Sequence, residues 1–334
     1  MNLNQNNQSP QFYIDGILKG NIAILSRAIT LVESTKDIHK LLAKQILEGI
    51  LNKTGNSFRL GITGVPGVGK STFIESFGKV IAAQGHKLAV LAVDPSSNKS
   101  KGSILGDKTR MEELSVMANV FIRPSPSSGT LGGVAKATYE TILLCEAAGF
   151  DFIIVETVGV GQSEVAVSKI TDFFLLLMLA GAGDELQGIK RGIMEMADSI
   201  IITKADGNNL EKAKAAKMEF AQAIHYLQLP ESGFIPKVEV CSALENKGIK
   251  ETYDLISNYK VFATANNYFE KKRKSQQFEL LLSTIDERLK SAFYEDVKIK
   301  EVLSQIKTEQ NDKTFLPFSL GIDLVNSFLS RHTD

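Results

Sequence analysis

Apolar residues recur at helical spacing between residue 12 and about residue 55 of the chain. Ile22, Leu25, Ile29 and Val32 follow one another at intervals of three or four, and few turn-forming residues interrupt them. Such spacing collects the apolar side chains on one face of a helix. We therefore predict two or three amphipathic helices in an N-terminal helical extension, residues 1–55, which ends at a Gly/Asn turn.

Short apolar runs alternate with helical stretches between residues 56 and 262. Several of the runs are apolar throughout, which is typical of strands buried on both faces of a parallel sheet. The seven predicted strands are residues 58–63, 87–93, 120–123, 152–155, 173–179, 199–203 and 237–241. Regular alternation of strand and helix predicts an α/β fold class, with a doubly wound, mostly parallel sheet over residues 56–262.

The chain changes character again after residue 262, where charged residues are frequent and no further strand is predicted. Phe278, Leu281, Ile285 and Leu289 share one face of a predicted long helix. Such a face needs a partner, either the sheet or a second copy of the chain. The basic run at residues 271–274 is interpreted as a solvated helix face, with a nucleic-acid patch as the alternative that the neutral charge of the whole chain disfavours.

Composition and charge exclude several classes of protein. The 334 residues carry 38 Lys and Arg against 38 Asp and Glu, so bulk charge does not attract nucleic acid or anionic lipid. The longest strongly apolar run, residues 173–182, is about half of the ~20 residues that a membrane-spanning helix needs. Cys145 and Cys241 form neither a disulfide framework nor a metal motif. We expect a cytoplasmic protein that binds neither nucleic acid nor membrane.

The most informative motif is a glycine-rich loop between the strand at 58–63 and the helix that follows it. It satisfies the pattern Gly-x-x-x-x-Gly-Lys-Ser/Thr, in which the glycines let successive N–H groups and a helix N-terminus face a polyphosphate. Lys70 would neutralise the β- and γ-phosphates, and the Ser71 hydroxyl would bind Mg²⁺. The residues expected around the phosphates are Gly64, Val65, Pro66, Gly67, Val68, Gly69, Lys70, Ser71 and Thr72.

A second motif, Thr203-Lys204-Ala205-Asp206, stands at the end of a predicted strand and indicates which base is bound. In G domains an Asn/Thr-Lys-x-Asp element at this place recognises guanine, because its carboxylate accepts hydrogen bonds from the base and its lysine stem covers the ring. Adenine lacks that donor pair and would leave Asp206 unsatisfied. The Ser-Ala element of G domains is matched after the next strand by Ser242, Ala243 and Leu244. The motifs predict GTP and GDP as ligands.

Three acidic residues stand where Mg²⁺ and the γ-phosphate are expected. Asp94 follows the strand 87–93, Glu156 follows the strand 152–155, and Asp107 lies in a loop that leads into a predicted helix. Carboxylates at the carboxyl ends of strands point into the crevice where open α/β sheets bind ligands. Together with the Ser71 hydroxyl they are the predicted metal ligands, although Asp107 could instead cap its helix.

The segment from Glu156 to Gly159 replaces the Asp-x-x-Gly of regulatory G domains. The Gly159 amide is the predicted sensor of the γ-phosphate, and the loop is expected to order when that phosphate is present. Gln162 is the local candidate for positioning the attacking water, although it is displaced from the place of the catalytic Gln in those domains. Hydrolysis by the chain alone is therefore expected to be slow.

Taken together, these motifs resemble the MeaB/ArgK-like G proteins, the GTPase chaperones of cobalamin-dependent methylmalonyl-CoA mutase. The resemblance covers nearly the whole chain, helical extensions included. One departure is Thr203, where Asn is commoner, but a Thr hydroxyl can still hydrogen-bond towards the phosphate loop. The matching segments are Gly-Val-Pro-Gly-Val-Gly-Lys-Ser-Thr (64–72), Val-Asp-Pro-Ser-Ser (93–97), Gly-Asp-Lys-Thr-Arg-Met (106–111), Glu-Thr-Val-Gly-Val-Gly-Gln-Ser-Glu (156–164), Gly-Asp-Glu-Leu-Gln-Gly-Ile-Lys-Arg-Gly-Ile (183–193) and Thr-Lys-Ala-Asp (203–206).

The resemblance implies a P-loop GTPase of the signal-recognition and metallochaperone class, with a C-terminal dimerisation arm over residues 263–334 and hence a homodimer. Its implied partner is a cobalamin-dependent acyl-CoA mutase, with methylmalonyl-CoA mutase the expected client. GTP hydrolysis would gate adenosylcobalamin delivery and protect or reactivate the mutase. Asp184 and Lys190 lie in a stretch that looks like an additional switch, and they would enter the nucleotide site when the mutase binds.

Three other functions stay open at this stage. Members of the family have been labelled kinases of periplasmic amino-acid-binding proteins, but the guanine element and the missing kinase catalytic-loop signature count against a kinase. A metal-delivery GTPase would need a Cys/His cluster, whereas His39, His86, His225 and His332 are scattered along the chain. A scaffold that binds nucleotide without hydrolysing it is the third.

Overall fold

The structure is a computed structural model of the chain, and it describes residues 9–94, 111–126, 131–157, 163–181, 191–308 and 316–331. The chain forms two compact units, residues 1–276 and residues 277–334. The first contains the sheet with its covering helices, and the described part of the second is helical.

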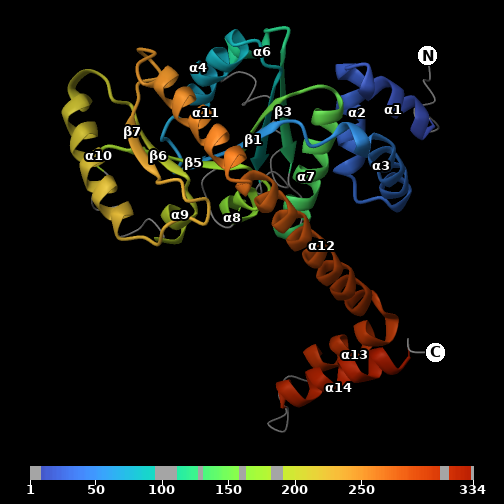
Figure 1. Cartoon of the computed structure of the whole chain (residues 1–334). Helices are drawn as coiled ribbons and strands as arrows, with labels where there is room; N and C mark the ends of the chain where they lie inside the picture. The colour runs from blue at the N-terminus through green and yellow to red at the C-terminus, as the bar shows by residue number, and fades with distance from the viewer. Residues whose placement is uncertain are drawn as a thin grey trace. The chain divides into compact units, whose positions relative to one another are not determined.

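Seven strands form one sheet in the first unit, and every pair of described neighbours is parallel (Figure 1). The strand order is β3-β2-β4-β1-β5-β6-β7, which places β1 near the centre. The strands are β1 (Phe58–Gly64), β2 (Leu88–Asp94), β3 (Val120–Pro126), β4 (Phe152–Thr157), β5 (Phe173–Leu179), β6 (Ser199–Thr203) and β7 (Lys237–Val240). The predicted fold class is confirmed, and each predicted strand is present.

Side chains alternate between the two faces of the sheet, and each face has its own core. On β5, Leu175 and Leu177 belong to a cluster with α4 (Lys70–Ala83) and α11 (Ile249–Ala265). Leu176 and Met178 point the other way and pack with α10 (Leu210–His225). Because successive residues of a strand face opposite sides, a fully apolar strand buries both faces. Helices therefore cover the sheet on both sides.

Three N-terminal helices, α1 (Pro10–Leu18), α2 (Ile22–Val32) and α3 (Asp37–Ile50), pack on one another and on α7 (Leu131–Ala147). The Asn21 side chain caps α2 by accepting from the N–H groups of Ala23 and Ile24. The remaining described helices of the first unit are η1 (Leu51–Lys53), α6 (Glu112–Ser115), α8 (Ser163–Ser168), α9 (Arg191–Met196), η2 (Gly207–Asn209) and the first turns of α12 (Tyr268–Glu295).

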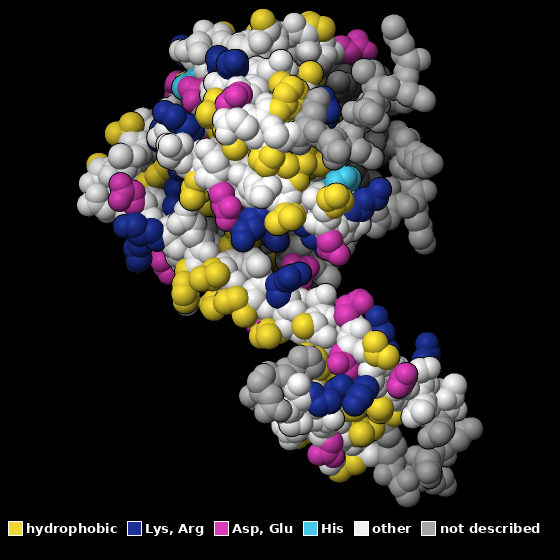
Figure 2. All heavy atoms as spheres, turned by 90° about the vertical axis from the view of Figure 1, so that its right-hand side faces the viewer, with side chains coloured by type: hydrophobic (Ala, Val, Ile, Leu, Met, Phe, Trp, Pro, Cys, Tyr) yellow, Lys and Arg dark blue, Asp and Glu magenta, His cyan; other side chains and the backbone are white. Residues whose placement is uncertain are grey.

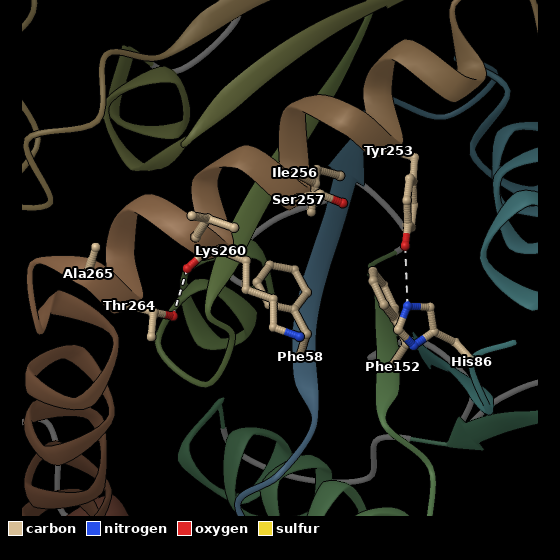
Figure 3. A pocket seen from close by; sticks show the side chains of 10 residues that line it. Phe58, His86, Phe152, Tyr253, Ile256, Ser257, Lys260, Thr264 and Ala265 are labelled. Carbon is tan, nitrogen blue, oxygen red and sulfur yellow. Dashed lines mark hydrogen bonds between the residues drawn. The ribbon is translucent and has the colours of Figure 1, made fainter. Parts of the chain in front are cut away.

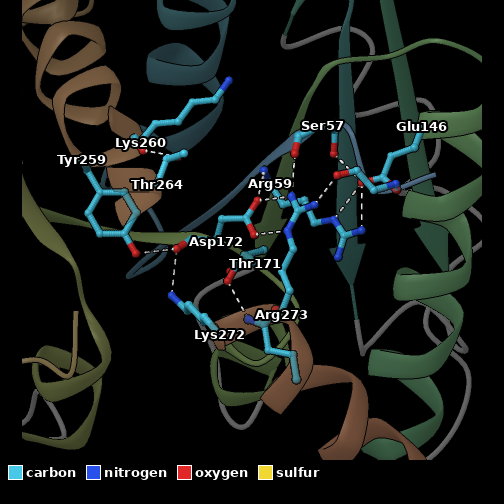
Figure 4. Close-up of polar contacts among 12 residues, drawn as sticks. Ser57, Arg59, Glu146, Thr171, Asp172, Tyr259, Lys260, Thr264, Lys272 and Arg273 are labelled. Atoms are coloured by element: carbon cyan, nitrogen blue, oxygen red, sulfur yellow. Dashed lines mark hydrogen bonds and ion pairs between the residues drawn. The ribbon is translucent and has the colours of Figure 1, made fainter. Parts of the chain in front are cut away.

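A buried ion network fixes the amino end of β1 (Figure 4). Glu146 on α7 accepts hydrogen bonds from the Gly55 N–H at 2.7 Å, the Ser57 hydroxyl at 2.6 Å and the Arg59 Nε at 2.9 Å. The Arg59 and Glu146 side chains are only 3% and 1% exposed. Two charges this deeply buried are tolerated because each has its partner, so the network holds β1 on α7.

The same network reaches α12. Arg273 donates from Nε and Nη2 to the two carboxylate oxygens of Asp172, at 2.8 and 2.7 Å. Its neighbour Lys272 donates to the Asp172 carbonyl at 2.8 Å and lies 3.5 Å from a carboxylate oxygen of Asp198. The interpretation of residues 271–274 as a solvated face was therefore wrong for these two, because the helix turns them onto buried acids at the base of β5 and β6.

We expect Arg59→Met to lower the free energy of unfolding by about 3 kcal/mol, because it leaves the Glu146 carboxylate buried without its cation. Chemical denaturation followed by circular dichroism measures this change. The matched control is Glu146→Gln in the Arg59→Met background, which removes the unpaired charge and should recover part of the loss. A single Arg59→Met variant as stable as the parent would contradict this account of the network.

The second unit contains the C-terminal part of α12 with α13 (Val297–Thr308) and α14 (Pro317–Ser330). Its helices are joined by an edge-to-face contact between Phe293 and Phe328 and by the ion pair of Arg331 with Asp296 at 3.2 Å. Many large apolar side chains of this unit remain exposed, and Figure 2 shows in yellow the hydrophobic side chains on the face turned to the viewer. The exposed ones include Phe278, Leu281, Leu282, Ile285 and Leu289 on α12 and Phe318, Ile322, Val325 and Leu329 on α14.

Two further observations concern the cysteines and the helices. Cys145 and Cys241 are free and buried, as predicted, and burial raises the pKa of the Cys241 thiol to about 12. Across the described ranges, none of the helices has both the length and the apolar character needed to pass through a bilayer.

Candidate functional site

The candidate site lies at the carboxyl end of the central strands, where β1 ends at Gly64 and a short loop leads to Lys70, the first residue of α4. Open parallel sheets bind ligands at the carboxyl ends of their strands, at the point where the strand order reverses. Glu156 of β4 lies opposite Ile62 of β1 in the strand pairing, so it reaches the same edge.

The loop has the backbone that its glycines permit. Gly67 and Gly69 have φ angles of 81° and 95°, in the left-handed region that L side chains rarely adopt. Gly64 allows a close approach, because a Cβ there would lie 2.6 Å from the Leu177 carbonyl oxygen. Gly69 precedes α4 and provides no side-chain cap to this 14-residue helix, whose N-terminus is the end that attracts an anion.

Lys70 is folded back onto its own loop. Its Nζ donates to the carbonyl oxygens of Gly64 and Val65, at 2.7 and 3.3 Å. Burial lowers the pKa of Lys70, and the nearby carboxylates of Glu156 and Glu164 oppose that shift. The side chain is thus a desolvated amine among carbonyl and carboxylate oxygens, where a phosphate would stabilise its charged form.

The Thr-Lys-x-Asp segment is hydrogen-bonded directly to the glycine-rich loop. The Thr203 hydroxyl donates to the buried Val68 carbonyl at 2.6 Å, so the hydrogen bond predicted for Thr at this position is present. Lys204 has a positive φ of 55°, and its Nζ donates to the Gly67 carbonyl at 2.8 Å. The stem of Lys204 therefore crosses the site next to the loop.

The Ser-Ala segment after β7 holds the acidic residue in place. The Ser242 hydroxyl donates to a carboxylate oxygen of Asp206 at 2.6 Å and accepts from the Glu245 N–H at 3.1 Å. The backbones are joined as well, because the Ala205 N–H donates to the Cys241 carbonyl at 2.9 Å. Ala243 accepts from Ser76 of α4, whereas the Leu244 side chain is 80% exposed. Three segments far apart in the sequence thus form one connected edge.

The structure describes the other predicted site residues only in part. Ser71 and Thr72 occupy the first turn of α4, and Glu156 is 8% exposed. Asp94 is the last residue of β2, and its side chain lies outside the description. Five predicted residues fall outside the described ranges: Asp107, Gly159, Gln162, Asp184 and Lys190.

Two neighbours of the site were missed by sequence reasoning. Glu164 is 2% exposed and acts electrostatically on Lys70, and Asn209 donates to the Lys204 carbonyl at 2.7 Å. Glu164 belongs to segment 156–164, which the sequence analysis recognised as a motif without predicting a role for this residue. Asn209 carries no motif of its own.

The oxygen donors fit a small hard cation only in part. In the described ranges, no three His, Cys, Asp or Glu side chains gather closely enough to hold a metal ion. A hydroxyl at Ser71 and a carboxylate at Glu156 are ligands of the kind that Mg²⁺ accepts, and Mg²⁺ at nucleotide sites usually draws further ligands from phosphates and water. The donor set therefore suits a magnesium ion that arrives with a polyphosphate.

Comparison with known proteins gives a family match over most of the chain. The family described as "Methylmalonyl Co-A mutase-associated GTPase MeaB" matches residues 25–298. The GTPase ArgK of Escherichia coli is 44% identical over 311 residues, which are 93% of this chain and 94% of that protein. A mitochondrial methylmalonic aciduria type A homolog of Mus musculus is 44% identical over 327 residues, covering 95% of this chain and 79% of that one.

A solved structure shares the fold closely. The crystal structure described as an LAO/AO transport system kinase has a TM-score of 0.78 and 36% sequence identity to this chain. The alignment covers 97% of this chain and 99% of the other. The similarity therefore extends beyond the sheet to the helical parts at both ends.

Proposed function

This chain belongs to the family of methylmalonyl-CoA mutase-associated GTPases, and we propose that it is a cytoplasmic chaperone that hydrolyses GTP and acts on a cobalamin-dependent acyl-CoA mutase. Residues 56–262 would form the GTP-binding domain, between a helical extension at 1–55 and a dimerisation arm at 263–334. In this function, hydrolysis gates the delivery of adenosylcobalamin and protects or reactivates the mutase.

The observation that carries the proposal is the direct bonding of the glycine-rich loop to the Thr-Lys-x-Asp segment, through Thr203 to Val68 and Lys204 to Gly67. A phosphate site and a base site joined in this way match the two ends of one nucleotide. The Asp206 carboxylate, oriented by Ser242, offers two acceptor oxygens to the N1–H and amino group of guanine.

Hydrolysis in this site would be an in-line attack of water on the γ-phosphate. Lys70 and the loop N–H groups would stabilise the negative charge that develops on the phosphoryl oxygens. Ser71, Asp94, Asp107 and Glu156 would hold Mg²⁺, which supplies further charge neutralisation when bound. Little covalent chemistry is left for the protein, so positioning dominates the rate.

We assign the remaining parts of the reaction to residues outside the described ranges. Gly159 would sense the γ-phosphate, and Gln162 would position the attacking water. Asp184 and Lys190 would complete the site only when the mutase is bound. On this reading the chain alone turns over slowly, and its client accelerates it.

We propose that the chain forms a homodimer through the exposed apolar faces of the second unit, on α12 and α14. Large exposed apolar faces are usually covered by a partner, and a second copy supplies a matching face by symmetry. Leu281→Asp combined with Leu289→Asp should convert a dimer into a chain of 36.5 kDa in light scattering. The control is Lys290→Asp on the same helix, which should leave the dimer intact. A parent protein that is already monomeric contradicts this part of the proposal.

The test of the client is stimulation of hydrolysis. Purified protein is mixed with candidate cobalamin-dependent mutases under GDP and GTP, and co-purification and phosphate release are measured together. A mutase that is retained by the protein and raises the release rate supports the proposal. No retention and no change of rate with any cobalamin-dependent mutase would contradict it.

A protein kinase remains the second candidate, favoured by the description of the similar solved structure as a transport system kinase. The two functions differ in where the γ-phosphate goes. With γ-labelled GTP, a hydrolase releases the label as free phosphate, whereas a kinase leaves it on a protein. Label found on protein in amounts equal to the nucleotide consumed would replace the GTPase proposal with the kinase.

A further inference from the structure

Figure 3 shows a pocket of about 520 Å³. It lies at the amino end of β1, whereas the glycine-rich loop follows the carboxyl end of that strand. It is lined by Phe58 at the start of β1, by Phe152 at the start of β4 and by one side of α11. We call it the amino-end pocket. Because β1 runs through seven residues before the loop begins, the pocket and the loop are separated by about 20 Å. No residue of the pocket belongs to the proposed nucleotide site.

The floor of the amino-end pocket is aromatic and rigid. Phe58 and Phe152 are 1% and 5% exposed, and their ring centroids are 5.4 Å apart. Ile256 of α11, which is 1% exposed, closes the inner wall. Large side chains packed this tightly keep their shape, so the floor of the pocket is preformed, whereas its outer side is exposed and includes Lys260 and Thr264. Its size lies in the range of small-molecule sites.

The polar side of the pocket, formed by His86 and Tyr253, has hydrogen-bond partners within the protein. The His86 Nδ1 lies 2.8 Å from a carboxylate oxygen of Asp151, and its Nε2 lies 3.2 Å from the Tyr253 hydroxyl. Both ring nitrogens therefore have partners, and the chain of three groups fixes the imidazole as a wall. Asp151 does not line the cavity.

Lys260 is the cationic side chain at the mouth of the pocket. In Figure 3 it reaches from α11 towards the floor, and its Nζ lies 5.8 Å from the centroid of the Phe58 ring. Within the part of the chain that is described, no carboxylate lies at ion-pair distance from this ammonium. A lysine held over an aromatic floor without an acid partner is complementary to an anion that brings its own apolar body.

We propose that the amino-end pocket binds a small organic monoanion, whose ring or chain packs on Phe58 and Phe152 and whose negative group pairs with Lys260. The charge favours this class of ligand, because the exposed Lys260 ammonium can pair with one negative group at the mouth, whereas a polyanion would have to bury surplus charge on an apolar floor. Its lining residues are separate from those proposed to act in GTP hydrolysis.

Two dyes of similar shape test the proposal. 8-Anilinonaphthalene-1-sulfonate carries one negative charge, and N-phenyl-1-naphthylamine is neutral, so their fluorescence titrations of the full chain separate charge from apolar contact. We expect Lys260→Gln to weaken binding of the sulfonate about three- to fivefold and to leave the neutral dye unchanged. Lys250→Gln, an exposed lysine near the start of the same helix, is the matched control and should change neither.

Filling the hollow tests its location. Ser257 lines the pocket, and Ser257→Phe should remove the saturable binding of both dyes, leaving the signal from exposed apolar surface elsewhere. If that variant fails to fold, Thr264→Trp at the exposed rim replaces it. Unchanged titrations in the filled variant would overturn the site. Loss of both dyes on filling, with no effect of Lys260→Gln on the sulfonate, would overturn the monoanion.

Discussion

Lys70→Ala is expected to lower the rate of GTP hydrolysis by at least about 100-fold. The ammonium lies at the head of α4 within reach of the loop carbonyls, where a β- or γ-phosphate oxygen would take their place. Removal of one preorganised donor from a developing negative charge commonly lowers the rate 10²- to 10³-fold. Among the described residues, no other lysine or arginine donates a hydrogen bond to the Gly64 and Val65 carbonyls, so none replaces Lys70. Release of phosphate under saturating GTP measures the effect.

A lysine on the same helix provides the control for this variant. Lys79 of α4 is half-exposed and pairs with Glu113 rather than with the loop. Lys79→Ala should therefore hydrolyse GTP at the parent rate. Equal rates for Lys70→Ala and Lys79→Ala, with both proteins folded by circular dichroism, would remove Lys70 from the reaction and favour a scaffold that merely binds nucleotide.

Asp206→Asn is expected to weaken GTP binding by about 10²- to 10³-fold. The carboxylate would accept two hydrogen bonds from guanine, and the amide that replaces it turns one acceptor into a donor facing a donor. A polar group matched to its ligand discriminates strongly because the mismatched pair leaves buried groups unsatisfied. Xanthine carries an oxygen where guanine carries the amino group, so xanthosine triphosphate should bind this variant better than the parent does.

Ser242→Ala tests how much the orientation of the Asp206 carboxylate contributes to guanine binding, apart from the carboxylate itself. It removes the 2.6 Å hydrogen bond that positions the Asp206 carboxylate, while both acceptor oxygens remain. GTP affinity should fall by about five- to tenfold, with no gain for xanthosine triphosphate. If Asp206→Asn kept the affinity of the parent for GTP, the base would be recognised by other groups, and the guanine reading of the Thr-Lys-x-Asp segment would be wrong.

The fold could be predicted from the sequence because its strongest signals are local. The run at β5 is apolar at every position, and such a strand can be stable only inside a sheet covered on both faces. The glycine-rich loop was equally readable, since only glycine adopts the backbone of Gly67 and Gly69 without strain.

Apart from the hydrogen bond of Thr203 towards the loop, which was expected, the contacts that organise the site could not be predicted, because they join residues that no spacing rule relates. Lys204 is 137 residues from Gly67, and Ser242 is 36 residues from Asp206. The buried ion network is a similar case, since Ser57 is 89 residues from Glu146. The basic run was misinterpreted as solvated for the same reason. The sequence shows that Arg273 is charged, but it does not show that this residue pairs with the buried Asp172, 101 residues away. The amino-end pocket has no motif, since each of its walls comes from a different element.

The most direct test of the central claim is phosphate release from GTP and from ATP, measured in parallel with purified protein and Mg²⁺. The proposed function predicts slow, saturable release from GTP that is lost in Lys70→Ala, and release from ATP no faster than that variant gives. Release from ATP at the rate of GTP, or release from GTP that survives Lys70→Ala, would contradict it.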